Sequence, residues 1–289
     1  MNVLVTGSAS GFAQLLLARL AAEPGIDLIL GVDQRESAFT HERYVQVLLD
    51  LRSPLLARVL QGMQTVIHLA PAASDDAAAR GEILGATQNL YTHAPAADVR
   101  QVIHLSSALV YDTQARSAID EQRAYGATPG CVAAEALQSA EAWLDDFEAG
   151  RPALRVVRLR PHWLVGPHSD SVLARLLRQH LTLRQQTASR LQCVHEDDVV
   201  EAILQALNSK LRGAFNLACK ESVTLSEMHR QARWLRLPMA ARLLARRLDT
   251  ASGCIDALSR SLVLNTKRAR TELGWKPRYD RVRDILRHA

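Results

Sequence analysis

Two glycines near the amino terminus have the spacing of a turn that receives a phosphate group. Gly7 and Gly11 stand in the segment TGSASGFA, which directly follows a short apolar run. Glycine lets the backbone turn sharply and approach a pyrophosphate, and the free N–H groups of a following helix point at that anion. In a GxxxGxG motif, Gly7 and Gly11 are the first two glycines and Ala13 stands at the third glycine position. In a GxxGxxG motif, Ser10 would stand at the second glycine position. We predict a pyrophosphate site at Gly7, Ser10, Gly11 and Phe12.

An acidic residue, Asp33, ends the next apolar run of the chain. A carboxylate at this place accepts the two ribose hydroxyls of an adenosine and repels a 2′-phosphate, which favours NAD over NADP. Arg35 follows closely and weakens this exclusion. The sequence therefore predicts NAD as the cofactor, and an NADP-dependent reductase is the weaker alternative.

Apolar runs alternate with helical patterns along the first half of the chain. Runs that are apolar throughout and are separated by helices are typical of a parallel sheet covered on both faces. Ligands bind such sheets at the carboxyl ends of the strands. We predict an α/β fold: a doubly wound parallel sheet (Rossmann) with a smaller C-terminal α/β substrate cap. The expected strands are residues 3–6, 28–32, 44–49, 66–69, 102–105 and 153–159, and the expected helices are residues 12–22, 54–61, 82–93 and 131–147.

The second half of the chain has no low-complexity linker that would separate it from the first half. We expect residues 1–165 to form the NAD-binding Rossmann domain and residues 166–289 to form the substrate-binding cap, partly interleaved with the Rossmann sheet at residues 190–210. Within this half we expect helices over residues 171–186 and 198–207, a strand over residues 214–217, and a basic amphipathic stretch over residues 228–247.

The composition excludes several classes of protein. Of the 289 residues 48% are hydrophobic, yet no apolar run is long enough to span a bilayer and the amino terminus does not resemble a signal peptide, so we expect a cytoplasmic protein. The net charge is +5, but basic residues lack interleaved aromatic ones, which make up only 4% of the chain, so we expect no nucleic-acid partner. Neither the histidines nor the cysteines have metal-ligand spacing, and we expect no metal site and four reduced thiols. The cysteines are Cys131, Cys193, Cys219 and Cys254.

Several further segments resemble the NAD-dependent epimerase/dehydratase family, the extended branch of the short-chain dehydrogenase/reductase superfamily. The resemblance covers nearly the whole chain, and the segments occur in the order that the family has them. They are Val5-Thr6-Gly7, Leu49-Asp50-Leu51, His68-Leu69-Ala70 and residues 85–90, 106–111, 158–167, 194–199 and 266–277.

This resemblance implies an oxidoreductase that acts on a nucleotide-sugar or a similar small carbonyl or alcohol substrate. It implies further cofactor contacts: from the Asp-Leu pair that contacts the adenine, and from residues at the ends of two strands. These contacts are Asp50, Leu51, Leu69, Ala70, Pro71 and Ser106. It also implies that Tyr111 forms a wall of the substrate pocket and that Arg184 and Arg190 contact a diphosphate.

Members of this family resemble one another in a Ser/Thr–Tyr–Lys constellation, from which this sequence departs. The tyrosine exchanges a proton with the substrate, and a lysine one helical turn later lowers its pKa. Ser107 takes the hydroxyl position. One register supplies Tyr125 but places a proline at the lysine position, and a second, which we prefer because it lies inside the expected helix, places Ala133 and Leu137 at the tyrosine and lysine positions. Neither register contains a lysine.

Two functions therefore stay open. The first is an NAD-dependent enzyme of the epimerase/dehydratase type, with Ser107 and Tyr125 as the catalytic candidates. The second is a redox-inactive protein that holds NAD as a sensor or structural part, because the Tyr–Lys pair is missing. The resemblance also suggests a homodimer formed through the helices expected at residues 81–93 and 131–147.

Overall fold

The computed structural model describes residues 1–69, 77–113, 117–151, 153–184, 188–232 and 237–289, and its centre is a seven-stranded parallel sheet. The strand order is β11-β6-β5-β4-β1-β2-β3, so the chain starts in the middle of the sheet and extends it in both directions. This confirms the predicted doubly wound topology. The strands are β1 (Asn2–Thr6), β2 (Leu28–Asp33), β3 (Tyr44–Leu48), β4 (Thr65–Leu69), β5 (Gln101–Leu105), β6 (Arg155–Pro161) and β11 (Gly213–Leu217).

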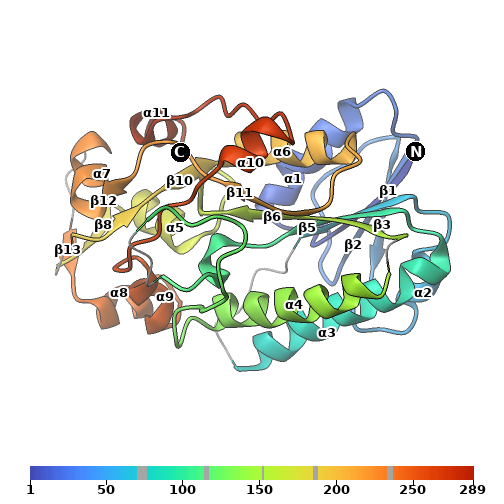
Figure 1. Cartoon of the computed structure of the whole chain (residues 1–289), viewed down its shortest axis with the longest axis horizontal. Helices are drawn as coiled ribbons and strands as arrows, with labels where there is room; N and C mark the ends of the chain where they lie inside the picture. Colours follow the sequence, from blue (N-terminus) through green and yellow to red (C-terminus); the bar gives the residue numbers. More distant parts are fainter. Residues whose placement is uncertain (70–76, 114–116, 152, 185–187, 233–236) are drawn as a thin grey trace.

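Helices cover both faces of this sheet (Figure 1). On one face α1 (Gly11–Ala22) and α6 (Glu196–Leu207) pack into one apolar cluster with the strands. On the other face α2 (Leu56–Val59), α3 (Ala77–His93) and α4 (Val132–Ala149) enclose a second cluster. The central strand β4 is buried at all of its residues, as expected for a strand that is covered on both faces.

The second half of the chain builds a cap with its own apolar core beside the sheet (Figure 1). It also returns to the sheet, because edge strand β11 and helix α6 both come from beyond residue 166. The cap strands are β7 (Trp163–Val165), β8 (Leu181–Leu183), β9 (Arg190–Leu191), β10 (Cys193–His195), β12 (Val223–Thr224) and β13 (Leu237–Met239). The remaining helices are α5 (Val172–Arg178), α7 (Leu225–Ala232), α8 (Ala241–Arg247), α9 (Ser252–Ala257), α10 (Lys267–Thr271) and α11 (Val282–Arg287), with short 3-10 turns η1 (Pro95–Ala97) and η2 (Ala108–Val110).

One helix expected in the cap is wrong in its extent. The helix expected over residues 171–186 ends at Arg178, because His180 adopts a left-handed backbone with φ 53° and the chain continues as β8. Strand β8 pairs with β13, and this pairing replaces a helical periodicity that was locally plausible. The basic amphipathic stretch over residues 228–247 contains the end of α7, then β13 and α8.

The expectation of four reduced thiols is also wrong. Cys131 and Cys254 form a disulfide bond that ties the residue before α4 to α9 of the cap. The backbones meet closely here, since a Cβ on Gly253 would collide with the carbonyl carbon of Gly130. No motif spacing signalled this pair, because its members are 123 residues apart in the sequence.

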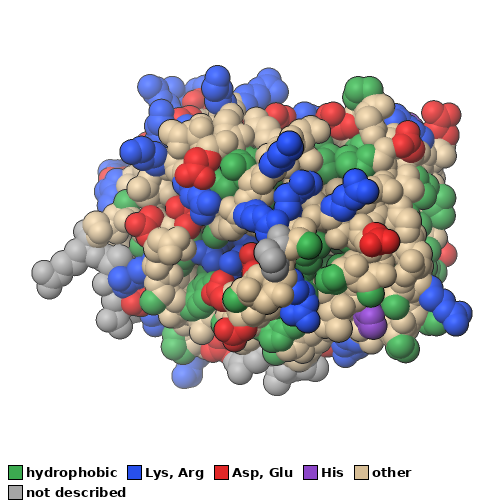
Figure 2. Space-filling view, turned by 45° about the vertical axis from the view of Figure 1, so that its right-hand side comes forward, with side chains coloured by type: hydrophobic (Ala, Val, Ile, Leu, Met, Phe, Trp, Pro, Cys, Tyr) green, Lys and Arg blue, Asp and Glu red, His purple; other side chains and the backbone are tan. Residues whose placement is uncertain are grey.

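The surface carries charges of both signs. On the face shown in Figure 2, Lys and Arg side chains are interspersed with Asp and Glu. Among the described residues, no helix combines the length and the apolar character that a membrane span requires.

Candidate active site

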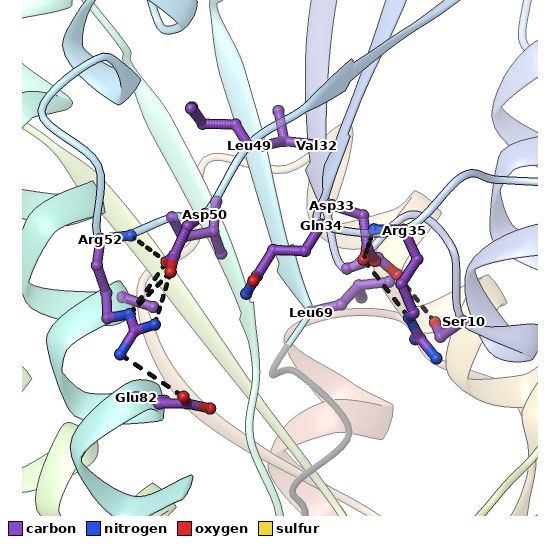
Figure 3. Close-up of a pocket in the computed structure, with 13 residues that line it drawn as sticks. Ser10, Val32, Asp33, Gln34, Arg35, Leu49, Asp50, Arg52, Leu69 and Glu82 are labelled. Atoms are coloured by element: carbon purple, nitrogen blue, oxygen red, sulfur yellow. Dashed lines mark hydrogen bonds and ion pairs between the residues drawn. The ribbon is translucent and has the colours of Figure 1, made fainter. Parts of the chain in front are cut away.

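A cavity of about 340 Å³ lies at the carboxyl ends of β1, β2 and β4. Gly7 forms its floor with φ +67°, a conformation that favours glycine, and a Cβ there would come within 3.3 Å of the Leu69 carbonyl oxygen. Figure 3 shows two polar groups that face each other across this cavity: Ser10, Asp33 and Arg35 on one side, Asp50, Arg52 and Glu82 on the other. The turn and the acidic strand end predicted from the sequence therefore meet in one place.

Ser10 caps helix α1, and its hydroxyl accepts a hydrogen bond from the amide of Ala13. The helix begins at Gly11, and no hydrogen bond is shown for the amides of Gly11 and Phe12, which leaves two N–H groups available for an anion. The Phe12 side chain instead packs into the core. A Cβ on Gly11 would lie 2.7 Å from the carbonyl oxygen of His168, so glycine is needed here for contact with the chain's own backbone.

Asp33 ends β2 with its side chain only 11% exposed. Its carboxylate accepts hydrogen bonds from the amides of Ala9 and Arg35, both at 3.0 Å. The first of these bonds joins the carboxylate directly to the glycine-rich turn. The Arg35 side chain lies 3.8 Å away and is 70% exposed, so its position does not fill the cavity.

The opposite wall contains a cation that the sequence analysis did not single out. The guanidinium of Arg52 donates to both oxygens of the Asp50 carboxylate and lies 3.6 Å from Glu82. Hydrogen bonds from Arg52 lower the pKa of Asp50. Leu51 is buried beside them and lines the same cavity.

A second cavity, of about 320 Å³, opens at the neighbouring strand ends. Leu69 lines the first cavity and Leu105 the second, and these two residues are partners in the β4–β5 register. The second cavity lies between the sheet, α4 and the cap. Its lining residues are Leu105, Ser106, Ser107, Leu109, Cys131, Ala133, Ala134, Leu137, Pro161, His162, Trp163, Leu164, Asp170, Ser171, Val172, Arg175, Asp249, Thr250 and Cys254.

Two serines follow β5 at this cavity. Ser107 precedes η2 and its hydroxyl accepts from the amide of Leu109 at 3.2 Å. Ser106 is buried, and its Oγ has no hydrogen-bond partner. A buried hydroxyl without a partner is uncommon in folded proteins, and one beside a cavity can satisfy a bound ligand.

Ala133 and Leu137 both line the cavity beside Ser107, one turn apart on α4. These are the residues that the second register places where the family has its tyrosine and lysine. The structure thus brings the three positions together, with an alanine and a leucine at two of them.

Tyr125 lies elsewhere, in a buried cluster of charges next to α4. Its hydroxyl donates to Asp145 at 2.8 Å and accepts from Arg160 at 3.1 Å, and burial raises its pKa. It is not among the residues lining the second cavity. We therefore do not retain Tyr125 as a catalytic candidate.

Tyr111 belongs to the same cluster and is completely buried, so it forms no pocket wall. Its hydroxyl donates to Asn216 and accepts from Arg160, both at 2.7 Å, and burial raises its pKa to about 12. Arg160 also binds Glu141 with two hydrogen bonds. Burial alone would raise the pKa of Glu141, but the charges of Arg160 and Arg158 outweigh it and lower this pKa to about 2.

His162 is a buried polar residue that lines the second cavity. Its Nδ1 lies against the backbone of Gln192, 3.1 Å from the amide nitrogen and close to the carbonyl oxygen. Nε2 makes no hydrogen bond to the described residues, and His162 lines the second cavity. Burial lowers the pKa of His162 to about 4, which keeps the ring neutral near pH 7.

The two arginines expected at a diphosphate lie away from both cavities. Arg184 follows β8, where it is exposed and its amide donates to Met239. Arg190 binds Ser222 and lies 3.9 Å from Glu227. Ala70 and Pro71, the remaining predicted cofactor contacts, fall outside the described residues.

Comparison with known proteins identifies the family. The model of the NAD dependent epimerase/dehydratase family matches residues 3–218. The chain belongs to this family. The match confirms the resemblance noted in the sequence, together with the predicted cofactor class and the expectation of an enzyme family. Two relatives, the uncharacterized proteins Rv0501 of Mycobacterium tuberculosis and Mb0513 of Mycobacterium bovis, are each 28% identical over 97% of this chain and 81% of their own length.

Solved structures of this family share the fold. MoeE5 in complex with UDP-glucuronic acid and NAD is 24% identical, with a TM-score of 0.80 over 100% of this chain and 97% of that chain. UDP-glucose 4-epimerase from Thermotoga maritima, in complex with UDP-glucose, is 19% identical, with a TM-score of 0.79 over 100% and 98%. UDP-glucuronic acid 4-epimerase from Bacillus cereus, in complex with NAD, is 17% identical, with a TM-score of 0.79 over 100% and 94%.

The residues of the first cavity fit a dinucleotide. A diphosphate can approach the glycine-rich turn and the open amides of α1, and a ribose can reach the carboxylate of Asp33. Ser106, whose hydroxyl has no hydrogen-bond partner in the described chain, follows the neighbouring strand β5, where the second cavity begins.

Proposed function

We propose that this protein is an NAD-dependent oxidoreductase of the epimerase/dehydratase type, which acts on a small alcohol or carbonyl compound in the cavity beside Ser107. One observation carries the proposal. The first cavity contains Gly7 and Asp33, and the second contains the hydroxyl groups of Ser106 and Ser107. The two cavities lie at the adjacent ends of the paired strands β4 and β5.

The chain's own residues divide the binding of the cofactor. The amides of Gly11 and Phe12 at the start of α1 would bind the diphosphate, Asp33 would accept the ribose hydroxyls, and Asp50 and Arg52 would border the adenine. NAD, when bound, supplies a hydride acceptor or donor at its nicotinamide end. Ser106 lines the cavity at that end, and its enclosed hydroxyl has no partner among the described residues.

Oxidation of an alcohol also releases a proton, and no tyrosine is among the described residues that line the second cavity. Ser107 can hold the substrate oxygen by a hydrogen bond. In the tautomer that donates Nδ1–H to the Gln192 carbonyl, the Nε2 lone pair of His162 accepts a hydrogen bond from the substrate hydroxyl, and because the lowered pKa keeps this ring neutral, the departing proton passes on to water. In the reverse direction water supplies the proton to the carbonyl oxygen.

Cofactor binding and turnover test the proposal separately. We expect calorimetry to show binding of NAD that is tighter than that of NADP, because Asp33 repels a 2′-phosphate. We expect a change in absorbance at 340 nm with at least one substrate from a panel of small alcohols, ketones and nucleotide-sugars. Tighter binding of NADP contradicts the cofactor assignment, and a lack of NAD binding contradicts the function.

A redox-inactive, NAD-binding protein is the second candidate, and one observation favours it. Ala133 and Leu137 occupy the cavity positions where the family has its proton-transferring pair. This function predicts NAD binding without turnover of any panel substrate. Turnover by the unmodified protein that is lost in the Ser107→Ala variant excludes it.

We also propose a homodimer that pairs through α3 and α4. The two helices pack side by side on one face of the sheet (Figure 1), where a second copy can add its own pair. Size-exclusion chromatography with light scattering tests this, and a monomer at micromolar concentration contradicts it.

A further inference from the structure

We infer that the cavity beside Ser107 takes a small uncharged alcohol or ketone and discriminates against substrates that carry a diphosphate. The inference rests on the proposed function, since it names the substrate class of the same site. It separates this protein from the neighbours described above, whose complexes contain nucleotide-sugars.

The lining of the cavity is predominantly apolar. A sugar with several hydroxyl groups needs a partner for each of them when it is desolvated, whereas a small alcohol or ketone needs partners for one oxygen. Ser106, Ser107 and His162 supply such partners at the end next to the sheet. The apolar side chains around them come from the sheet, α4 and the cap: Leu105, Leu109, Ala133, Ala134, Leu137, Pro161, Trp163, Leu164 and Val172.

Arg175 is the one cation among the lining residues of the described chain, and it lies beside a carboxylate. Its Nη1 donates to the backbone carbonyls of Leu248 and Asp249, and its Nε, which makes no hydrogen bond within the described chain, lies 3.9 Å from the Asp170 carboxylate, so a phosphate at Arg175 would compete with that carboxylate. Recognition of a diphosphate requires cations with free donors, as in bidentate arginine pairs. The two arginines predicted for that task lie away from the cavity, as described above.

Asp249 adds a negative charge on the cap side of the cavity. Its carboxylate forms no ion pair with any residue that the structure describes, and the residue is exposed. Its backbone is left-handed, with φ 47°, a conformation that aspartate and asparagine tolerate better than other side chains. An anion that enters the cavity therefore meets a carboxylate without a counter-ion.

The size of the cavity supports the same conclusion. Its volume is about 320 Å³, near the lower end for ligand pockets. Two exposed carboxylates, Asp170 and Asp249, are among its lining residues. Both the small volume and these negative charges favour a ligand without phosphate groups.

Two probes test the inference without any need for turnover: cyclohexanol, which is uncharged, and UDP-glucose. Ligand-observed NMR measures the binding of each probe to the full chain, with and without NAD. Ala133→Phe fills the cavity, and Ala142→Phe makes the same change at an exposed position of α4. We expect Ala133→Phe to weaken cyclohexanol binding at least tenfold and Ala142→Phe to leave it unchanged.

A second pair of variants tests the charge and does not alter the packing of the cavity. Asp249→Asn removes the negative charge and keeps a side chain suited to the left-handed backbone. We expect it to strengthen UDP-glucose binding about tenfold at low salt and to leave cyclohexanol binding unchanged. Asp256→Asn, at an exposed position of the nearby helix α9, is the matched control and should change neither.

Each outcome decides for or against the inference. It is overturned if UDP-glucose binds the unmodified protein more tightly than cyclohexanol does and loses that binding in Ala133→Phe. It is also overturned if cyclohexanol does not bind, or if Asp249→Asn leaves UDP-glucose binding unchanged. Because these measurements are also made without NAD, a protein that fails to bind NAD disproves the proposed function and leaves the test of the cavity intact.

Discussion

The carboxylate of Glu141 on α4 accepts two hydrogen bonds from Arg160 on β6, at 2.8 and 2.7 Å. In the register that the structure brings to the second cavity, Glu141 lies one helical turn beyond Leu137, the position where the family has its lysine. In this chain the cation that pairs with Glu141 is therefore Arg160, which lies on strand β6 and not on α4 itself. The pair joins α4 to the sheet beneath the candidate active site.

This pair predicts a specific sensitivity to acid. Because the pKa of Glu141 is lowered to about 2 from an ordinary 4.5, its ionised form stabilises the fold above pH 4.5, and this stabilisation is lost as the pH falls from 4.5 towards 2. Linkage gives a contribution of about 3 kcal/mol. Glu141→Gln should lower the free energy of unfolding at pH 7 by about 3–5 kcal/mol, since it leaves buried arginine charge uncompensated.

Urea unfolding between pH 2 and pH 7 measures both effects, and the variant should lose less stability than the unmodified protein as the pH falls below 4.5. Glu201→Gln is the control, because Glu201 forms an exposed pair with Arg19 and should contribute about 0–1 kcal/mol. A Glu141→Gln variant as stable as this control contradicts the role of the buried pair.

Tyr125→Phe should leave NAD-linked turnover within a few-fold of the unmodified protein, because its hydroxyl is engaged in the charge cluster. The lost hydrogen bond to Asp145 should reduce stability by about 1 kcal/mol. Ser107→Ala, by contrast, should reduce turnover about 100-fold if its hydroxyl holds the substrate oxygen. Steady-state kinetics at 340 nm compares the two, and a larger loss in Tyr125→Phe would restore that tyrosine as a catalytic residue.

Replacing Ala133 by Tyr together with Leu137 by Lys rebuilds the family's proton-transfer pair beside Ser107. A general acid or base contributes about 100- to 10,000-fold to rate, so we expect the double variant to increase NAD-linked turnover within that range. Ala142→Tyr, at an exposed position of the same helix, should have no effect. A double variant that folds, binds NAD and gains no activity shows that the cavity geometry does not support this chemistry.

Asp33→Ala should weaken NAD binding by about 10- to 100-fold, because two ribose hydroxyls lose their acceptor. NADP binding should weaken less, since the repulsion of its 2′-phosphate disappears with the carboxylate. Calorimetric titration with both cofactors checks the ratio. Glu36→Ala removes an exposed carboxylate close to Asp33 in the sequence, and it should change neither affinity.

The Cys131–Cys254 disulfide closes a long loop, since its cysteines are 123 positions apart in the sequence. The chain-entropy model gives a stabilisation of about 4–5 kcal/mol for a loop of this length. A reductant should therefore lower the Tm of the unmodified protein and leave that of the Cys131→Ser/Cys254→Ser double variant unchanged. If the two proteins respond alike to the reductant, the bond does not stabilise the fold.

Local sequence patterns determined the Rossmann half of this protein. The continuous apolar runs predict buried parallel strands because both faces of such a strand are covered, and six of the seven strands of the central sheet match a predicted run in the first 165 residues. The glycine-rich turn and Asp33 are equally local, because each works at the end of its own strand. These features were sufficient for the fold class and the cofactor class.

Only the tertiary structure decided the candidate active site. Tyr125 and Ala133 were both compatible with the sequence, and their places were decided by a buried charge cluster whose members come from α4 and β6. Likewise, Arg175 and Asp249 meet at one cavity although they are far apart in the chain, and so do the cysteines of the disulfide. Contacts of this kind depend on how separate elements pack, and neither periodicity nor motif spacing within one segment carries that information.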